Sequence, residues 1–220
     1  MLGAIFDMDG VLFPTEELKF LAYRKVFEDE FGVELTDTPQ RLGLSETKAM
    51  ELFLGLHNLK DGLERIPELI EKKRLTYYEI LVREKFGPYE GAEDFLKQAK
   101  NSGKFKLGLA TSSNRQSVDI LFEKFDLRKY FDSVLTLEDI ARPKPDPEIY
   151  LISARQLNIK PSGCIVFEDS NAGVEAAKRA GMKCIAVSNT APKEQLAKAD
   201  LIIAGFKNLT LFAVENELIK

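Results

Sequence analysis

The stretch LGAIFDMDG, residues 2–10, decides how the rest of the chain is interpreted. Its first five residues form an apolar run, which is typical of a strand buried on both faces of a parallel sheet. Two aspartates, Asp7 and Asp9, follow where this strand ends. Acidic residues there either form an ordinary turn or belong to a metal or catalytic site, and the remaining sequence has to distinguish the two.

The bulk composition is that of an ordinary globular protein. The 220 residues, 45% hydrophobic and 30% charged, suffice for one large domain or a core with a smaller inserted domain. The 31 basic residues are scattered among 35 acidic ones and give a net charge of -4, so nucleic acid is not an expected partner. Cys164 and Cys184 lie in or beside apolar runs and are expected to be core thiols.

The N-terminus and the apolar runs predict the cellular location of the protein. The chain begins directly with a strand-like run, without a basic leader and cleavage site, and no apolar stretch reaches the roughly 18 residues that span a bilayer. We therefore expect a cytoplasmic protein that does not contact a membrane. The sequence does not determine the oligomeric state, and a monomer is slightly favoured.

Short apolar runs alternate with longer amphipathic stretches along most of the chain. The strand-like runs are residues 2–6, 106–110, 134–135, 164–167, 183–187 and 201–203, and the helical patterns are 91–102, 114–126, 146–158, 171–180 and 192–198. This alternation predicts an α/β fold with a Rossmann-like, doubly wound parallel sheet. In such sheets ligands bind beyond the carboxyl ends of the strands, which is where Asp7 lies.

One long segment interrupts the alternation. Between about residues 15 and 86 only helical patterns occur, punctuated by glycines and Pro39. We expect an α-helical cap domain over residues 15–87, inserted into a core of residues 1–14 and 88–220, with hinges near Phe13-Pro14 and Gly87-Pro88. The alternative is that these helices pack on the core as ordinary crossover helices.

Polar residues also follow other expected strands. Thr111-Ser112-Ser113-Asn114 runs into a helix, where hydroxyls and free backbone N–H groups either seat a phosphate or simply cap the helix. Glu168 and Asp169 form a second acidic pair at a strand end. Four gathered carboxylates repel one another without a cation, and an all-oxygen set favours Mg²⁺ over zinc. The single histidine, His57, lies in the expected cap and is interpreted as structural or exposed.

Lys144 stands in a proline-rich segment, RPKPDP, residues 142–147. Prolines on both sides restrict the backbone and would fix the direction of the amine. A surface lysine in a turn is the ordinary interpretation of such a segment. Beside four acids and a phosphate seat, a held cation would instead balance the charge on a transferring phosphoryl group.

Taken together, these motifs resemble those of the haloacid dehalogenase-like (HAD) phosphohydrolases with a helical cap, over essentially the whole chain. DMDG at residues 7–10, TSS at 111–113, Lys144 in KPDP and EDSNAG at 168–173 appear in order at matching strand ends. Each motif is weak alone, and the ordered set is specific. The resemblance implies an enzyme that hydrolyses a small phosphomonoester, a sugar or polyol phosphate, with Mg²⁺ as cofactor.

The resemblance also assigns roles to individual residues. Asp7 would be the nucleophile that forms an aspartyl-phosphate, and Asp9 would be the acid and base, which requires a pKa raised relative to that of Asp7. Dehalogenation needs neither a metal nor a proton donor, so Asp9 favours phosphoryl transfer. Mg²⁺ would bind the Asp7 carboxylate, the Asp9 carbonyl, Asp169 and Glu168. The phosphoryl oxygens would be held by Thr111, the backbone of Ser112, and Lys144.

The cap should distinguish a phosphatase from a β-phosphoglucomutase, which is the main alternative. The mutase has a histidine after the first linker and a cap loop of the type Lys-Gly-Val-Ser-Arg, whose two cations hold a second phosphate. Here Lys19 and the segment RLGLSE, residues 41–46, stand at these places. Glu46 would repel a distal phosphate by roughly 1 kcal/mol or more, which favours hydrolysis.

Some cap residues remain candidates for substrate contact. Arg41 and Lys48 could replace the missing cations from neighbouring positions, and Lys19 and Arg24 could also face the substrate. Each of them can equally be a solvated helix charge. A non-catalytic phosphosugar-binding protein is a further alternative, which the complete motif set disfavours.

Overall fold

The structure, a computed structural model, describes residues 1–41 and 44–219, and the chain folds into two compact units. The first unit contains Met1–Pro14 and the chain from Phe86 onward, and the second is Thr15–Lys85. The expected cap covers residues 15–87. No helix in the described part of the chain is both long and apolar enough to cross a membrane.

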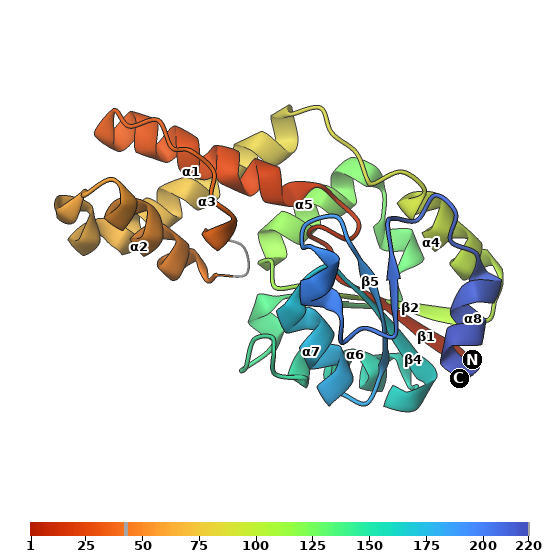
Figure 1. Ribbon diagram of the computed structural model, residues 1–220. Coiled ribbons are helices and arrows are strands. Elements are labelled where there is room, and N and C mark those ends of the chain that lie inside the picture. The colour runs from red at the N-terminus through yellow and green to blue at the C-terminus, as the bar shows by residue number, and fades with distance from the viewer. Residues whose placement is uncertain (42–43, 220) are drawn as a thin grey trace. The chain divides into compact units, whose positions relative to one another are not determined.

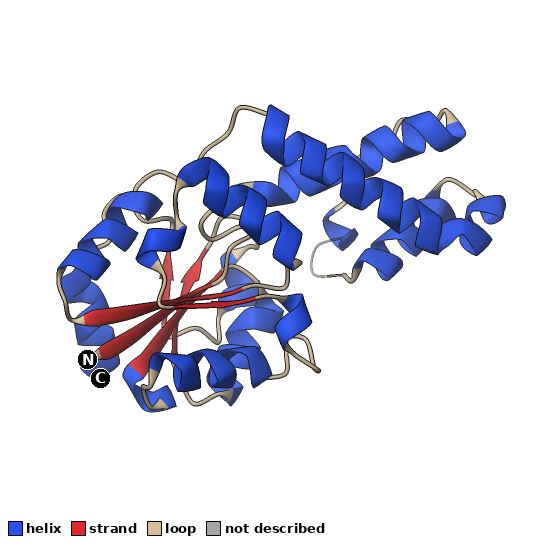
Figure 2. Ribbon diagram, turned by 180° about the vertical axis from the view of Figure 1, so that it is seen from behind, coloured by secondary structure: helices blue, strands red, loops and turns tan. Residues whose placement is uncertain are grey.

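The first unit is built on a parallel sheet of six strands in the order β3-β2-β1-β4-β5-β6. The strands are β1 (Leu2–Phe6), β2 (Phe105–Ala110), β3 (Ser133–Leu135), β4 (Cys164–Glu168), β5 (Lys183–Val187) and β6 (Leu201–Ile203). The helices are α4 (Ala92–Asn101), α5 (Arg115–Phe125), α6 (Glu148–Leu157), α7 (Asn171–Arg179) and α8 (Leu211–Ile219), and they flank the sheet (Figure 1, Figure 2). The prediction of a doubly wound parallel sheet is therefore confirmed.

Both faces of the central strand β1 are covered, which explains its apolar sequence. Ile5 belongs to the buried cluster beneath α6 and α7, while the Phe6 ring stacks on Phe167 of β4 at 4.5 Å and meets Phe95 of α4 edge-on. Gly3 has no room for a side chain, because a Cβ there would lie 2.6 Å from the sulfur of Cys164. Cys164 and Cys184 are buried free thiols, as expected.

The sheet order places a switch point at the end of β1. Chain order runs outward from β1 to β2 and β3 on one side, and from β4 to β5 and β6 on the other. Phe6 at the end of β1 pairs with both Leu109 of β2 and Phe167 of β4. The loop after β1 therefore leaves the sheet at the crevice where doubly wound folds bind their ligands.

In the C-terminal part of the chain one expected helix is wrong and one observed helix was not predicted. The helix expected over 192–198 is only the 3₁₀ helix Lys193–Leu196. Its turns close by i to i+3 bonds, in which Gln195 N–H donates to the Pro192 carbonyl (3.0 Å) and Ala199 N–H to the Leu196 carbonyl (2.9 Å). Helix α8 was not expected, and it packs against α4 and β4 with Val214 buried.

The second unit, in its described residues, contains only helices as regular structure. These are α1 (Thr15–Phe31), α2 (Glu46–Leu56) and α3 (Ile66–Arg83), with short 3₁₀ helices at Pro39–Arg41 and Lys60–Arg65. Helix α3 packs against both α1 and α2. Phe27 and Phe53 are fully buried between them, so this unit has an apolar core of its own.

Candidate active site

The loop after β1 is a tight turn that brings two acidic strand ends together. Asp7 is buried, and its N–H still donates to the Phe167 carbonyl of β4 (2.9 Å). Gly10 has a positive φ of 75°, and a Cβ there would lie 1.8 Å from Asp169 Oδ2. Only glycine permits both this turn and this approach. The acidic ends of β1 and β4 therefore meet, as the sequence predicts.

Lys144 lies between the first and the last motif. Its Nζ is 2.7 Å from Asp7 Oδ1 and 2.7 Å from Glu168 Oε1, and it donates to the Ala110 carbonyl at 3.1 Å. The lysine side chain is only 6% exposed. One ammonium thus joins the ends of β1, β2 and β4. Because Lys144 donates to Glu168 as well as to Asp7, it fixes the Asp7 carboxylate relative to the end of β4.

Glu168 is fully engaged by hydrogen-bond donors. Its Oε1 also accepts from the hydroxyl of Tyr150 (2.7 Å), a fully buried residue of α6. Its Oε2 accepts from the N–H groups of Asp169 (3.0 Å) and Ser170 (3.1 Å) and from the Ser170 hydroxyl (3.0 Å). We expected Glu168 among the metal ligands. In the structure both of its oxygens anchor Lys144 and the start of α7.

Burial and charge shift the pKa values of these groups in opposite directions. Burial raises the pKa of Asp7 to about 7, Lys144 opposes this shift, and the carboxylates of Glu168 and Asp9 add to it. Burial also disfavours the charged forms of Lys144 and Glu168, but Lys144 lowers the pKa of Glu168, and Asp7 and Glu168 together raise that of Lys144. The pair Lys144–Glu168 is therefore ionised. The raised pKa belongs to the residue expected as nucleophile, and a bound cation would lower it.

The loop after β2 holds Asp9. The Ser113 hydroxyl donates to Asp9 Oδ2 at 2.6 Å, and the Thr111 hydroxyl lies 3.4 Å from the same oxygen. Thr111 and Ser113 are buried, whereas Ser112 is exposed. Asn114 caps α5 by accepting from the Ser117 N–H at 2.9 Å. Asn114 is therefore the residue that caps the helix, whereas the hydroxyls of Thr111 and Ser113 face Asp9.

The loop after β5 also reaches the site, and the sequence analysis did not select it. Asn189 Nδ2 donates to the Gly10 carbonyl at 2.9 Å. The Thr190 hydroxyl forms a short hydrogen bond to the carboxylate of Asp169. The sequence analysis missed Tyr150, Asn189 and Thr190, and it placed Ser113 in the expected phosphate seat without predicting its bond to Asp9. For Asn189 and Thr190 a signal was available, because they follow a buried strand as the other motifs do.

The donor groups at these strand ends fit a hard divalent cation. Among residues 1–41 and 44–219, no three His, Cys, Asp or Glu side chains are arranged so that they could hold a metal. Glu168 is engaged elsewhere, which leaves the Asp7 and Asp169 carboxylates and the Asp9 carbonyl. Mg²⁺ commonly takes one or two carboxylates and completes its shell with water and substrate phosphate. This small all-oxygen set suits that pattern and lacks the His or Cys ligands that zinc prefers.

The expected substrate contacts of the cap differ in their surroundings. Arg41 is buried, and its guanidinium pairs with Asp37 through two bonds (2.6 and 3.0 Å) and with Glu16 at 3.2 Å. Lys19 also pairs with Glu16, at 2.8 Å. Lys48 is exposed, and its N–H is capped by Ser45, while Arg24 is exposed on α1. Arg41 is thus a structural ion-pair residue of the helical unit and not a solvated helix charge.

Glu46 is neutralised within the second unit. Its carboxylate accepts from Lys73 Nζ at 3.0 Å and from Arg74 at 2.6 and 2.8 Å. Burial opposes ionisation, but these two cations hold the pKa of Glu46 below its usual range. The expectation that Glu46 alone repels a distal phosphate is therefore not supported by its surroundings. Leu42 and Gly43 of the same segment lie outside the described residues.

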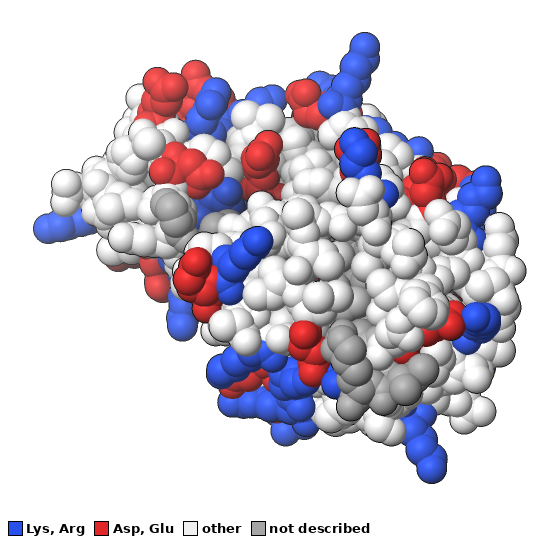
Figure 3. All heavy atoms as spheres, turned by 45° about the vertical axis from the view of Figure 1, so that its right-hand side comes forward, with Lys and Arg blue, Asp and Glu red and all other residues white. Residues whose placement is uncertain are grey.

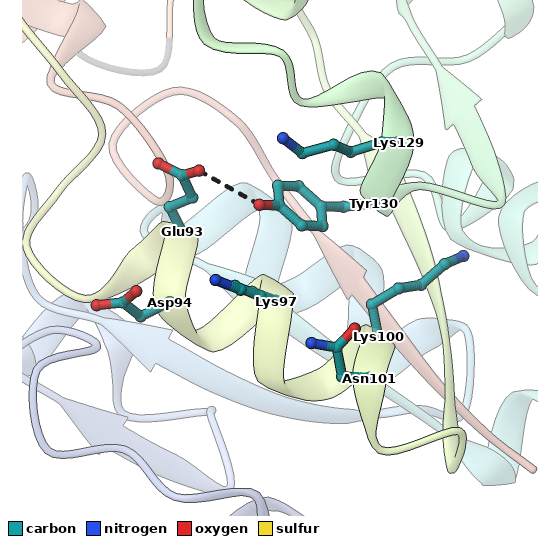
Figure 4. Close-up of a pocket in the computed structure, with 7 residues that line it drawn as sticks. All are labelled: Glu93, Asp94, Lys97, Lys100, Asn101, Lys129 and Tyr130. Carbon is teal, nitrogen blue, oxygen red and sulfur yellow. Dashed lines mark hydrogen bonds between the residues drawn. The ribbon is translucent and has the colours of Figure 1, made fainter.

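An open depression lies elsewhere on the first unit, between α4 and the 3₁₀ helix Arg128–Tyr130 (Figure 4). Tyr130 donates to Glu93 at 3.3 Å, and Lys129 pairs with Asp126. The residues that line the depression lie outside the strand-end loops.

On the face of the molecule in Figure 3, acidic and basic side chains are interspersed.

Comparisons with known proteins agree with this geometry. Residues 4–187 match the family model described as haloacid dehalogenase-like hydrolase. The chain is 38% identical to a phosphorylated carbohydrates phosphatase of Thermotoga maritima, over 84% of each chain. It is 32% identical to a β-phosphoglucomutase of Bacillus subtilis, over 99% of this chain and 95% of the relative.

Solved structures show the same relationship. The crystal structure of CbbY from Rhodobacter sphaeroides in complex with phosphate superposes with a TM-score of 0.82 at 25% identity, covering 98% of this chain and 100% of that one. A putative β-phosphoglucomutase from Thermotoga maritima superposes with a TM-score of 0.77 at 33% identity, over 98% and 99% of the two chains. The family match covers most of the chain and includes every strand end described above except the loop after β5. The chain therefore belongs to the haloacid dehalogenase-like hydrolase family.

Proposed function

We propose that this hydrolase is a phosphatase that cleaves the phosphomonoester of a small sugar or polyol, with Asp7 as nucleophile and Asp9 as acid and base. One observation carries the proposal. The buried Asp7 carboxylate is held through one oxygen by Lys144, while Asp9 is fixed by a separate hydroxyl of Ser113. The names of the relatives, a phosphatase for phosphorylated carbohydrates among them, support the substrate class.

The two aspartates are held differently, and this suits different roles. Among the described residues, only Lys144 donates to the Asp7 side chain, through Oδ1, which leaves Oδ2 to attack phosphorus. As the bond from Oδ2 to phosphorus forms, the ester P–O bond breaks, and protonated Asp9 gives its proton to the leaving alcohol oxygen. Asp9, now a carboxylate, then takes a proton from the water that attacks the aspartyl-phosphate. Inorganic phosphate leaves, and Asp7 is regenerated.

Lys144 and the loop after β2 would hold the phosphoryl group. The proposed contacts are the Lys144 ammonium, the Thr111 hydroxyl and the backbone of Ser112, which lies on the exposed side of its loop. The third proton of Lys144 is donated to the Ala110 carbonyl in this structure. Donors fixed before the substrate arrives stabilise the developing charge without rearranging. The Asp7 and Asp169 carboxylates and the Asp9 carbonyl would hold Mg²⁺, which when bound neutralises phosphate charge and favours the ionised form of Asp7. Glu168 is assigned to positioning Lys144.

Phosphate release tests the proposal. Wild-type protein with Mg²⁺ is assayed against a panel of sugar and polyol phosphates and a generic aryl phosphate, beside Asp7→Asn. The variant is expected to lose turnover by at least about 10³-fold, because an amide is not a nucleophile of this kind, while its circular dichroism stays native. Retained turnover in Asp7→Asn would refute the assignment of the nucleophile. Absence of release from every ester would favour a binding protein.

A phosphosugar mutase is the second candidate, and one observation favours it. Glu46, whose charge was expected to repel a second phosphate, is paired with Lys73 and Arg74. The match to a β-phosphoglucomutase points the same way. Interconversion of glucose 1- and 6-phosphates without free phosphate would establish the mutase and overturn the phosphatase. The cap role of residues 15–87, with Lys19 and Lys48 near the substrate, belongs to the proposal for either activity, and Arg41 is assigned to its ion pairs with Asp37 and Glu16.

A further inference from the structure

We infer that the loop after β5, Ser188-Asn189-Thr190, is a functional part of the strand-end site, and that Thr190 is a positioning residue that aims the Asp169 carboxylate at the divalent cation. The inference deepens the proposed function and rests on its metal site. It concerns residues outside the four motifs, and the family model matches the chain only up to residue 187.

The Thr190 hydroxyl is hydrogen-bonded to Asp169. It donates a short hydrogen bond to Asp169 Oδ2 and lies 3.4 Å from the main-chain carbonyl of the same residue. Asp169 itself is only 6% exposed. A carboxylate that is buried and bonded to a fixed hydroxyl has lost most of its rotational freedom.

Gly10 shows how closely the three loops are packed. A Cβ on Gly10 would lie 1.8 Å from Asp169 Oδ2 and 2.8 Å from Thr190 Cγ2. The carbonyl of Gly10 accepts from Asn189 Nδ2 at 2.9 Å. Two neighbouring residues of one loop therefore act on two sides of the site, since Asn189 holds the turn after Asp9 and Thr190 holds Asp169.

The loop is itself anchored to the sheet. Ser188 N–H donates to the Ile203 carbonyl of β6 at 2.9 Å, and the Ser188 hydroxyl reaches the same oxygen at 3.3 Å. The loop can therefore hold its position while a ligand binds. Hydrogen bonds to a ligating carboxylate fix its orientation, and removing such a partner typically lowers metal affinity by about 10- to 100-fold.

Binding of Mg²⁺ alone, followed by isothermal titration calorimetry on the full chain, tests the inference. Thr190→Val keeps the shape and removes the donor, and Thr190→Ser restores it. The control is Thr76→Val in α3 of the second unit, which removes a hydroxyl that bonds to the Lys72 carbonyl. We expect the Kd of Thr190→Val for Mg²⁺ to rise about 10- to 100-fold, with Thr190→Ser and Thr76→Val within about threefold of wild type. The metal-free melting temperature of Thr190→Val is also expected to fall, because the buried Asp169 carboxylate loses a donor, so the Kd for Mg²⁺ is the measurement that decides.

A purely structural role predicts a different pattern. It would lower the metal-free melting temperature of Thr190→Val and leave the Kd for Mg²⁺ unchanged, and that result overturns the inference. If Thr190→Val does not fold, Asn189→Ala takes its place and is expected to raise the Kd through the loosened Gly10 turn. An unchanged Kd in that variant would overturn the inference as well.

The titration needs no phosphate ester, so it is independent of the proposed reaction. If wild type binds Mg²⁺, Thr190→Val weakens binding and no ester is hydrolysed, the inference stands and the proposed function fails. If wild type does not bind Mg²⁺ at millimolar concentration, the inference falls with the metal site. Where turnover is found, the kcat of Thr190→Val should recover at saturating Mg²⁺, which separates weaker binding from damaged chemistry.

Discussion

Tyr150→Phe tests whether the carboxylate of Glu168 is held as the structure shows. The substitution removes one hydroxyl from a fully buried side chain and leaves the ring in place. Lys144 Nζ lies 5.0 Å from the centre of that ring and keeps this contact in the variant. The interaction that is lost is the 2.7 Å bond to Glu168 Oε1.

The expected cost follows from the other partners of Glu168. A hydrogen bond to a charged group contributes about 1.5–3 kcal/mol, and a buried carboxylate that loses one cannot recover it from water. Lys144 and the donors at the start of α7 remain in place, so we expect the lower half of that range, about 2 kcal/mol. For a chain of this size this corresponds to a melting temperature lower by about 4–8 °C.

The assay is thermal and urea unfolding of Tyr150→Phe beside a matched control. Tyr130→Phe removes a hydroxyl that donates at 3.3 Å to the exposed carboxylate of Glu93, so its unfolding free energy should change by no more than about 0.5 kcal/mol. Equal losses in both variants would refute the reasoning, because the burial and charge of Glu168 would then have no energetic consequence. A stabilised Tyr150→Phe would refute it as well.

Two further predictions concern the loop after β2 and the edge of the sheet. Ser113→Ala should lower kcat about 10- to 100-fold, because Asp9 loses its 2.6 Å partner, whereas the exposed Ser112→Ala should stay within about threefold in the same phosphate-release assay. Asp200→Asn tests pH dependence by urea unfolding: burial opposes the shift, but Lys178 and a backbone N–H hold the pKa of Asp200 below its usual range. A carboxyl with a lowered folded pKa adds stability above its unfolded pKa, so the variant should lose about 1 kcal/mol at pH 7, and this difference should shrink as the pH falls below about 4. A pH-independent difference would contradict the assignment.

The inner strands could be predicted because they are buried on both faces. In a parallel sheet covered by helices, a strand is a continuous apolar run, and β1 and β5 begin and end at the predicted residues. Helix α8 was missed although its sequence, LFAVENELI, has apolar residues at helical spacing. The segment 192–198 was predicted to be an α-helix, because its composition does not reveal that its turns close by i to i+3 hydrogen bonds.

Candidate site residues could be predicted where they lie directly after a buried strand. Asp7 and Asp169 were selected because acidic residues follow two buried strands, and the structure brings these strand ends together. Tyr150 could not be found in this way, since an aromatic residue inside an amphipathic helix looks like core. Its hydroxyl acquires a role only when α6 packs near the end of β4, and that approach is set by the tertiary fold.

The surroundings of Glu46 show why a charge argument from sequence can fail. The expected repulsion treated its carboxylate as an isolated charge, but Lys73 and Arg74 lie within 3.0 Å, and Glu71 lies 4.0 Å from Arg74, so these four charges sum to zero and not to one negative charge. Lys73 is only 4% exposed; burial lowers its pKa, and the contact with Glu46 opposes that shift. An anion near this cluster would therefore not meet a net negative charge. The electrostatic argument against a mutase is removed, and the choice between hydrolysis and transfer depends on where the phosphate of the proposed aspartyl-phosphate goes.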